Sequence, residues 1–177
     1  LRKLTGAEVA TRMTFLLLDA TPSEDVLLAA EGGALDTPEG VRALAEELLD
    51  DPRARASVSA LYDEVLGVRN VVDTTLVVKD TSLFPEFSPA IASAMREETS
   101  RLVEDIVWTR DADFRELLTA DYTFVTPELA TLYGLGATPP GWSKVHFGAD
   151  QLRAGFLGGG AYLTTYAHKS RTSPTLR

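Results

Sequence analysis

Residues 88–106 read SPAIASAMREETSRLVEDI, and this stretch decides the fold class. Ser88 belongs to the residue types that cap helices, because its side-chain oxygen accepts a hydrogen bond from a free amide of the first turn. Pro89 follows at the position where proline removes no intrahelical hydrogen bond. Apolar residues then recur at helical spacing, at Ile91, Met95, Leu102 and Ile106. The stretch therefore predicts a long amphipathic helix.

The same punctuation recurs along the chain. Five of the nine prolines follow a capping residue, at Thr21-Pro22, Thr37-Pro38, Asp51-Pro52, Ser88-Pro89 and Thr126-Pro127. Two starts carry a glutamate three positions after the cap, a capping box: Thr5 with Glu8 and Thr21 with Glu24. Because apolar residues follow each start at helical spacing, we expect helices over 6–18, 22–31, 38–49, 52–66, 89–108 and 127–133. We expect them to pack around Leu16, Leu48, Leu61, Ile91, Leu102 and Leu132.

The pattern changes after Gly134. Residues 144–147, KVHF, alternate polar and apolar side chains as a half-buried strand does. Residues 155–166, GFLGGGAYLTTY, are typical of a strand with a bulge or a close backbone approach. The predicted fold is mainly α: a single multi-helix domain over residues 1–140, then a short β-containing or irregular C-terminal segment over 141–177.

The composition limits the classes of function. A formal net charge of −9 argues against nucleic acid and anionic membrane surfaces as partners, because both attract basic proteins. The apolar runs are too short for a membrane span. The chain contains no cysteine, and its two histidines, His146 and His168, lie far apart in sequence, so we expect no metal site and no cofactor in this segment. No nucleophile motif or phosphate loop is recognisable, so we expect no catalytic residues here.

Four blocks in order resemble domain-of-unknown-function family 1592. They are ATRMTFLLLDATPSEDVLLAA, DPRARASVSALYDEVLGV, LFPEFSPAIASAMREETSRLVEDIV and LLTADYTFVTPELATLYGL, over residues 10–30, 51–68, 83–107 and 117–135. Residues 152–177, LRAGFLGGGAYLTTYAHKSRTSPTLR, resemble the opening of its usual neighbour, family 1588. The chain departs from that neighbour at residues 158–160, where the family tends to have Thr-Gln-Ala, and at residues 168–170, where it has Asn-Pro-Thr.

The resemblance implies an exported, multi-domain protein of planctomycetes or myxobacteria, located in the periplasm, outer membrane or cell surface. Such proteins often carry a c-type cytochrome segment or carbohydrate-binding-like modules elsewhere. The activity of such proteins is unknown. Because no nucleophile, metal set or phosphate loop is recognisable, we favour a non-catalytic scaffold or binding module, with neighbouring domains of the same polypeptide, another protein or a saccharide as partner. The alternative is part of an enzyme, in one form redox and haem-associated, whose active site other domains complete. The chain would then be a fragment, with exposed apolar surface near Phe156, Leu157, Tyr162 and Tyr166.

The tail after Asp150 contains no carboxylate and is the first candidate ligand site. Its polar side chains could hold a carboxylate, a phosphate or a sugar, and they are His168, Lys169, Arg171, Thr172 and Ser173. The alternative is a loop whose side chains cap the backbone. We expect this structural role, with the cations meeting acids from nearby helices at one edge of the helical domain.

Asp121 and Tyr122 are the second candidate, because they belong to the most family-like block. For them too, core packing and chain turning are the alternative. Asp111, Asp113 and Glu116 offer oxygens for a cation, but Asp113 and Glu116 also form a capping-box pattern, which is the interpretation we favour.

Overall fold

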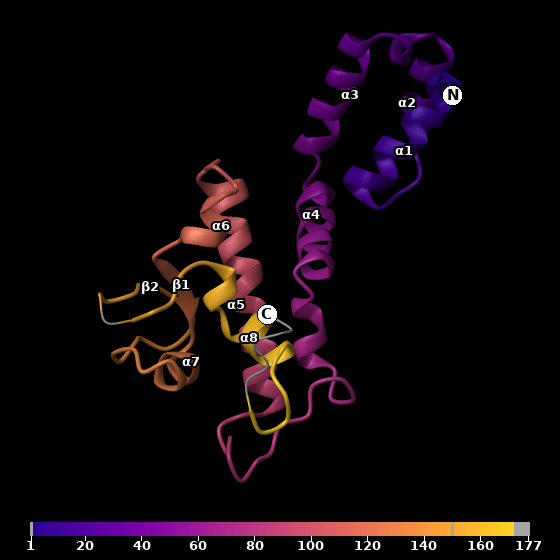
Figure 1. Ribbon diagram of the computed structural model, residues 1–177. Coiled ribbons are helices and arrows are strands. Elements are labelled where there is room, and N and C mark those ends of the chain that lie inside the picture. The colour runs from indigo at the N-terminus through magenta and orange to yellow at the C-terminus, as the bar shows by residue number, and fades with distance from the viewer. Residues whose placement is uncertain (1, 150, 172–177) are drawn as a thin grey trace. The chain divides into compact units, whose positions relative to one another are not determined.

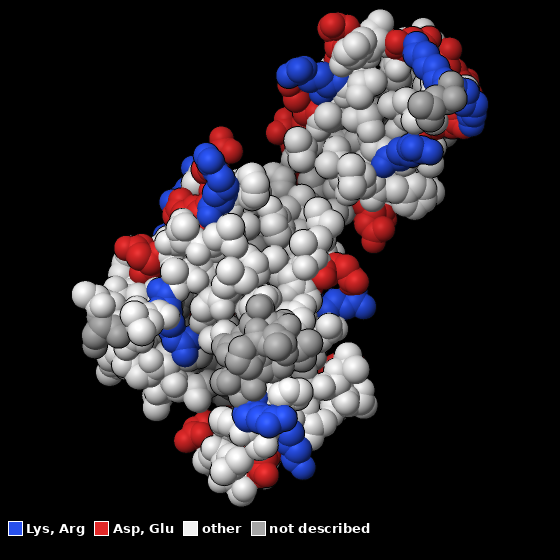
Figure 2. All heavy atoms as spheres, viewed as in Figure 1, with Lys and Arg blue, Asp and Glu red and all other residues white. Residues whose placement is uncertain are grey.

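The computed structural model describes residues 2–149 and 151–171 (Figure 1). The fold is mainly α-helical, as the sequence predicts, and its described strands form one two-stranded sheet. The chain divides into two compact units, Leu1–Leu61 and Tyr62–Arg177, which we call the N-terminal and C-terminal units. On the face drawn in Figure 2, acidic and basic side chains are interspersed over both units.

The N-terminal unit is a small helical array. Its elements are α1 (Gly6–Leu18), α2 (Glu24–Glu31), the 3₁₀ turn η1 (Ala34–Asp36), α3 (Pro38–Asp50) and the first part of α4 (Pro52–Val65). Its buried apolar residues are Ala10, Leu18, Val26, Ala30, Leu35, Leu44, Leu48 and Ala54. Helices α1 and α2 cross closely at Gly6, where a Cβ atom would lie 2.7 Å from the Ala30 carbonyl oxygen.

The C-terminal unit is organised around α5 (Pro89–Val103), which continues as the π-helical turn η3 (Glu104–Thr109). The other elements are η2 (Val68–Val72), α6 (Glu116–Thr119), β1 (Tyr122–Val125), α7 (Pro127–Leu132), β2 (Ser143–His146), η4 (Phe156–Gly158) and α8 (Gly160–Thr165). Helix α5 is packed against η2, β1, α7 and α8 (Figure 1). The unit therefore buries its longest helix at its centre.

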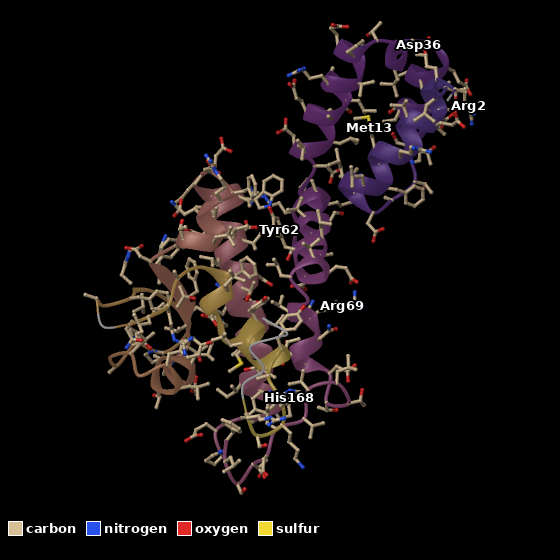
Figure 3. All side chains as sticks on the ribbon, in the orientation of Figure 1. Arg2, Met13, Asp36, Tyr62, Arg69 and His168 are labelled. Atoms are coloured by element: carbon tan, nitrogen blue, oxygen red, sulfur yellow. The ribbon has the colours of Figure 1, made fainter. Side chains whose placement is uncertain are left out.

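The core of this unit has two parts along α5. One surrounds Met95 and includes Val68, Val71, Val125, Leu129, Tyr133 and Ala161. The other surrounds Ile106 and includes Leu102, Val103, Leu117, Ala120 and Tyr122. Tyr62, labelled in Figure 3, packs against both parts, so the second half of α4 is anchored in this core.

The strand predicted over residues 144–147 is confirmed as β2. It pairs antiparallel with β1, and Tyr122 lies opposite His146 in the register. The pairing ties residues after 140 to the most family-like block. Whether residues 141–177 begin a further module stays a prediction.

Most helix starts are where the capping residues place them. Thr5, Thr37, Ser88 and Thr126 each cap the helix that follows, and Thr5 and Glu8 form the expected capping box.

Two capping boxes are wrong. Helix α2 begins at Glu24, because the Ser23 hydroxyl accepts from the Val26 amide at 3.4 Å, so Thr21 caps nothing there. The second wrong capping box is that of Asp113 and Glu116. The Asp113 side chain accepts from the Arg115 amide at 3.0 Å, but α6 begins only at Glu116, and the residue at its cap position is Arg115.

The glycine-rich stretch over residues 155–166 is helical, so the predicted bulged strand is wrong. It forms η4 and α8, and α8 begins at Gly160, where there is no room for a side chain. A Cβ atom at Gly160 would lie 2.1 Å from the Tyr133 hydroxyl oxygen and 2.9 Å from Met95 Cγ. The glycines thus allow a close approach, but of a helix rather than a strand.

The predicted core positions are partly wrong. Leu48 and Leu102 are buried and Ile91 is half-buried, whereas three of the six leucine and isoleucine positions are open to solvent: Leu16, Leu61 and Leu132, at 70%, 51% and 37% exposure. Each lies on an apolar stretch wider than the buried stripe of its helix. In α1 the buried stripe runs through smaller residues, namely Gly6, Ala10 and Thr14, and ends at Leu18.

The apolar surface expected after residue 150 is found only in part. Leu157 is 42% exposed, whereas Phe156, Tyr162 and Tyr166 are half-buried. Their rings contact one another, with centroids 5.6 Å apart for Phe156 and Tyr162 and 4.8 Å apart for Tyr162 and Tyr166. The aromatic side chains therefore pack largely within the unit.

A candidate ligand pocket in the C-terminal unit

A pocket of about 270 Å³ opens in the C-terminal unit, and we call it the tail pocket. Its apolar walls are Phe84, Phe87, Met95, Leu132, Tyr133 and Leu163. Four basic side chains and one acidic side chain also line it, namely Lys79, Arg153, His168, Arg171 and Glu86. They come from the connection before α5, the loop before η4 and the tail after α8, where Figure 3 labels His168.

Lys79 attaches the tail to the connection before α5. Its Nζ atom donates to the carbonyl oxygens of Thr164, Ala167 and His168, at 2.8, 3.0 and 3.3 Å. These carbonyls lie at and just beyond the end of α8, where a helix leaves acceptors free and favours a cation. Burial lowers the pKa of Lys79 below its ordinary value. The ammonium group uses its three donors inside the protein.

Glu98 does not line the tail pocket, but it is hydrogen-bonded to Tyr133, which does. Its carboxylate is buried, and it accepts from the Thr123 hydroxyl at 2.6 Å and from the Tyr133 hydroxyl at 2.6 Å. The Tyr133 oxygen in turn accepts from the Gly160 amide at 3.0 Å. Burial raises the pKa of Glu98, and the pKa of Tyr133 lies well above its ordinary value because of burial and then the neighbouring charge of Glu98. The network fixes the Tyr133 ring as a wall of the pocket.

The guanidinium group of Arg153 lies over that wall. Its guanidinium carbon is 4.1 Å from the centroid of the Tyr133 ring, a cation–π distance. Its Nη1 atom donates to the Gly158 carbonyl oxygen at 2.7 Å. The two contacts hold the guanidinium group in place at the pocket.

The structure divides the predicted tail site. His168 and Arg171 line the tail pocket, and Lys169 is exposed outside its walls. Thr172 and Ser173 lie outside the described residues. The acid that meets Lys169 comes from the connection before α5 rather than from a helix. The pKa of Asp80 lies below its ordinary value, first because of the hydrogen bond from the Ser82 side chain and also because of the charge of Lys169. The Asp80 amide also donates to the Lys169 carbonyl oxygen at 3.1 Å.

Asp121 and Tyr122 lie away from the tail pocket, at the two-stranded sheet. The exposed Asp121 carboxylate is 3.3 Å from His146 Nδ1. The Tyr122 hydroxyl donates to Asp105 at 2.8 Å, and Lys144 and Arg110 each donate to the same carboxylate at 2.9 Å. Burial alone would raise the pKa of Asp105, but these bonds, first that of Lys144, lower it below its ordinary value.

This cluster around Asp105 balances its charges internally, since it holds two cations and, with Glu116 on Arg110, two acids. It joins the end of α5 to the sheet. The arrangement supports the structural alternative for Tyr122. Asp111, Asp113 and Glu116 do not form a cation site: no group of metal-ligating side chains is found within the described residues.

Sequence reasoning missed four residues of the site: Lys79, Glu98, Tyr133 and Arg153. One signal was available for Glu98, which falls between Met95 and Leu102 on the apolar stripe of its helix rather than opposite it. An acid at a stripe position of a buried helix indicates a buried partner. No local pattern marks Lys79 or Arg153, because their role depends on segments far away in sequence.

The fold is mainly α-helical, and a pocket of its C-terminal unit combines apolar walls with basic side chains. Residues 4–135 match the family PSD4, described as a protein of unknown function (DUF1592). The chain belongs to this family. Neither the curated proteins nor the solved structures contain a match to the chain. None of the described helices is long and apolar enough to cross a membrane.

Proposed function

We propose that the C-terminal unit is a non-catalytic binding module and that the tail pocket holds its ligand. The module belongs, in this proposal, to a larger exported cell-envelope protein. The pocket binds a small molecule, and the remaining surface of the unit contacts neighbouring domains of the polypeptide.

One observation carries the proposal. Four basic side chains from three separate segments converge on an apolar pocket in a chain of net charge −9: Lys79, Arg153, His168 and Arg171. Like charges brought together repel one another, and acids could offset that cost. Yet within residues 2–149 and 151–171 none of the four forms an ion pair, although ion pairs are common elsewhere on the unit. Glu86 at the pocket and the buried Glu98, whose pKa burial raises and the charge of Arg153 lowers to a smaller extent, offset these cations in part. A pocket with basic side chains in excess is suited to an anion.

The same geometry favours binding over catalysis. Both oxygens of Glu98 accept hydrogen bonds from within the protein, and the Lys79 ammonium group donates to three carbonyls. These two groups therefore hold the walls in place. A general acid or base must instead reach a proton of the substrate.

The test compares Arg171→Ala with a matched control, Arg69→Ala. Both positions are exposed arginines of the C-terminal unit, and Arg69, labelled in Figure 3, pairs with Glu64 outside the pocket. A panel of small carboxylates, phosphates, neutral alcohols and saccharides is screened by calorimetry and thermal melting. A ligand at a hundred times its Kd adds about 2.7 kcal/mol of stability.

We expect a saturable ligand in the panel, bound normally by Arg69→Ala and about two- to fivefold more weakly by Arg171→Ala, because an exposed charge acts on the ligand through water. The unliganded variants should retain stability within about 0.5 kcal/mol of the parent, because both changes are at the surface. A panel without any ligand contradicts the proposal. So does an Arg171→Ala variant that loses stability but binds normally, since that result assigns the tail a structural role.

Export is a separate proposal, and the family resemblance alone supports it. It is tested by fractionating cells that make the native protein and locating it with an antibody. Recovery in the cytoplasmic fraction alone would contradict export and would leave the binding module untouched.

A further inference from the structure

We propose that the ligand of the tail pocket is a small monocarboxylate with an apolar body, and that Arg153 binds its carboxylate. The proposal rests on the proposed function, because it requires the pocket to be a binding site. It adds the chemical class of the ligand and the residue that selects it.

Arg153 presents an unused hydrogen-bonding edge. The guanidinium group has five N–H donors in a rigid fork that matches a carboxylate. The Nη1 atom donates to the Gly158 carbonyl oxygen, and the guanidinium carbon lies over the ring of Tyr133. Among the described residues, no hydrogen bond is formed by Nε or Nη2 of this side chain. These two atoms form one edge of the fork, the geometry for a bidentate bond.

The other basic side chains do not offer this geometry. Lys79 has donated its three hydrogens to carbonyl oxygens, so it contributes charge but no free donor. Arg171 and His168 are exposed on the tail, where contacts to an anion are screened by water and salt. They attract the anion toward the pocket, and Arg153, which is half-buried and already fixed, binds it.

The site is cationic overall. Its permanent cations are Lys79, Arg153 and Arg171, whereas its acids are Glu86 at the pocket and Glu98 behind Tyr133, and burial raises the pKa of Glu98. Placing two negative charges in a mostly apolar site costs more than placing one. A singly charged carboxylate is therefore favoured over a doubly charged phosphate.

The remaining walls determine the rest of the ligand. They are aromatic or aliphatic, with Phe84, Phe87, Leu132 and Leu163 among them. The Thr164 hydroxyl contacts Met95 Sδ at 3.7 Å, so it is turned toward the protein. At about 270 Å³ the pocket is slightly smaller than the usual ligand site of about 300–1,000 Å³, so it suits a small ligand. A saccharide would find few partners for its hydroxyls here, while a small aromatic or branched aliphatic body fits.

The experiment uses three probes of similar size: phenylacetate, its neutral analogue 2-phenylethanol, and phenyl phosphate. Calorimetry on the full chain should give the tightest binding for phenylacetate, by at least tenfold over each of the others. Arg153→Lys keeps the charge and removes the fork. It should weaken phenylacetate at least tenfold and leave 2-phenylethanol within twofold.

A second variant tests the proposal even if Arg153→Lys does not fold. Leu132→Glu places a negative charge at a partly exposed wall position of the pocket, and Leu118→Glu is its control on α6, outside the pocket. The first should weaken phenylacetate by more than it weakens the alcohol, and the control should change neither.

The outcomes separate the two proposals. Equal binding of phenylacetate and 2-phenylethanol overturns the carboxylate inference and leaves the binding module standing. Tightest binding of phenyl phosphate overturns it too. Unchanged phenylacetate binding in a folded Arg153→Lys overturns the role of Arg153. If these probes and the wider panel all fail to bind, the proposed function itself is wrong.

Discussion

Gly160→Ala is the sharpest test of how the site is built. Gly160 begins α8, and the space beside its Cα atom is filled by the side chains that form the buried network. A new methyl group would lie 2.1 Å from the Tyr133 hydroxyl oxygen, 2.9 Å from Met95 Cγ and 3.1 Å from Met95 Cε. Atoms cannot remain at such distances, so Tyr133 or α8 must move.

The expected loss of stability follows from the packing and the hydrogen bonds that this movement disrupts. Overpacking a well-packed core by one methyl group costs about 1–3 kcal/mol. If the Tyr133 hydroxyl is displaced, it also loses the Gly160 amide and the buried Glu98 carboxylate, and one lost bond of this kind costs about 1–3 kcal/mol. Alanine returns up to about 1 kcal/mol through its better helix propensity. We therefore expect a net loss of about 2–4 kcal/mol.

The assay can be confined to the C-terminal unit. The chain has two tryptophans, Trp108 and Trp142, and both belong to this unit. Urea unfolding followed by tryptophan fluorescence thus reports its stability. The control is Gly136→Ala, an exposed position where a Cβ atom meets nothing within 4 Å. We expect the control to stay within about 0.5 kcal/mol of the parent.

A Gly160→Ala variant as stable as the control would refute the close contact between α8 and Tyr133. The placement of the Glu98 network and the tail pocket depends on that contact. If Gly160→Ala costs as much stability in a Tyr133→Phe background as it does in the parent, the clash lies at Met95 instead. Either result would change which residue forms the wall of the pocket.

Three further predictions concern stability alone. Burial raises the pKa of Glu98 above its ordinary 4.5, so the folded protein keeps this proton to higher pH than the unfolded chain does. The free energy of unfolding therefore decreases as the pH rises from about 4.5 through the pKa of the folded state. The stability of the parent relative to Glu98→Gln, from urea curves at several pH values, should therefore fall from pH 4 to pH 7, and a flat difference would contradict the burial of a titrating carboxyl. Arg96→Ala should cost about 1–2 kcal/mol, because the Arg96 Nε atom donates at 2.9 Å to the buried Asp63 carboxylate, which would lose this partner. The loss is limited because Arg96 is half-exposed. An unchanged urea midpoint would show that water replaces the arginine as the partner of Asp63. Leu48→Ala should cost about 2–4 kcal/mol in circular-dichroism unfolding while Leu16→Ala stays within about 0.5 kcal/mol, and equal losses would mean that the exposure of Leu16 is wrong.

The sequence by itself determined where most helices begin. A capping oxygen and a following proline act within one helical turn, so Thr5, Thr37, Ser88 and Thr126 fix their helix starts through local bonds. The alternation in residues 144–147 likewise determined a strand, because alternate side chains of a strand point to opposite faces. These features need no information from distant segments.

Only the tertiary structure decided which side chains are buried and which polar groups share a site. Leu16 is exposed and Glu98 is buried, against their usual preferences, because burial depends on which segments pack against each helix. The glycine-rich stretch forms a helix rather than a strand, and Tyr133 occupies the space beside Gly160, where a side chain would lie. The tail pocket brings together residues as distant in sequence as Lys79 and Arg171. Contacts of that range leave no local pattern in the chain, and the site follows from packing.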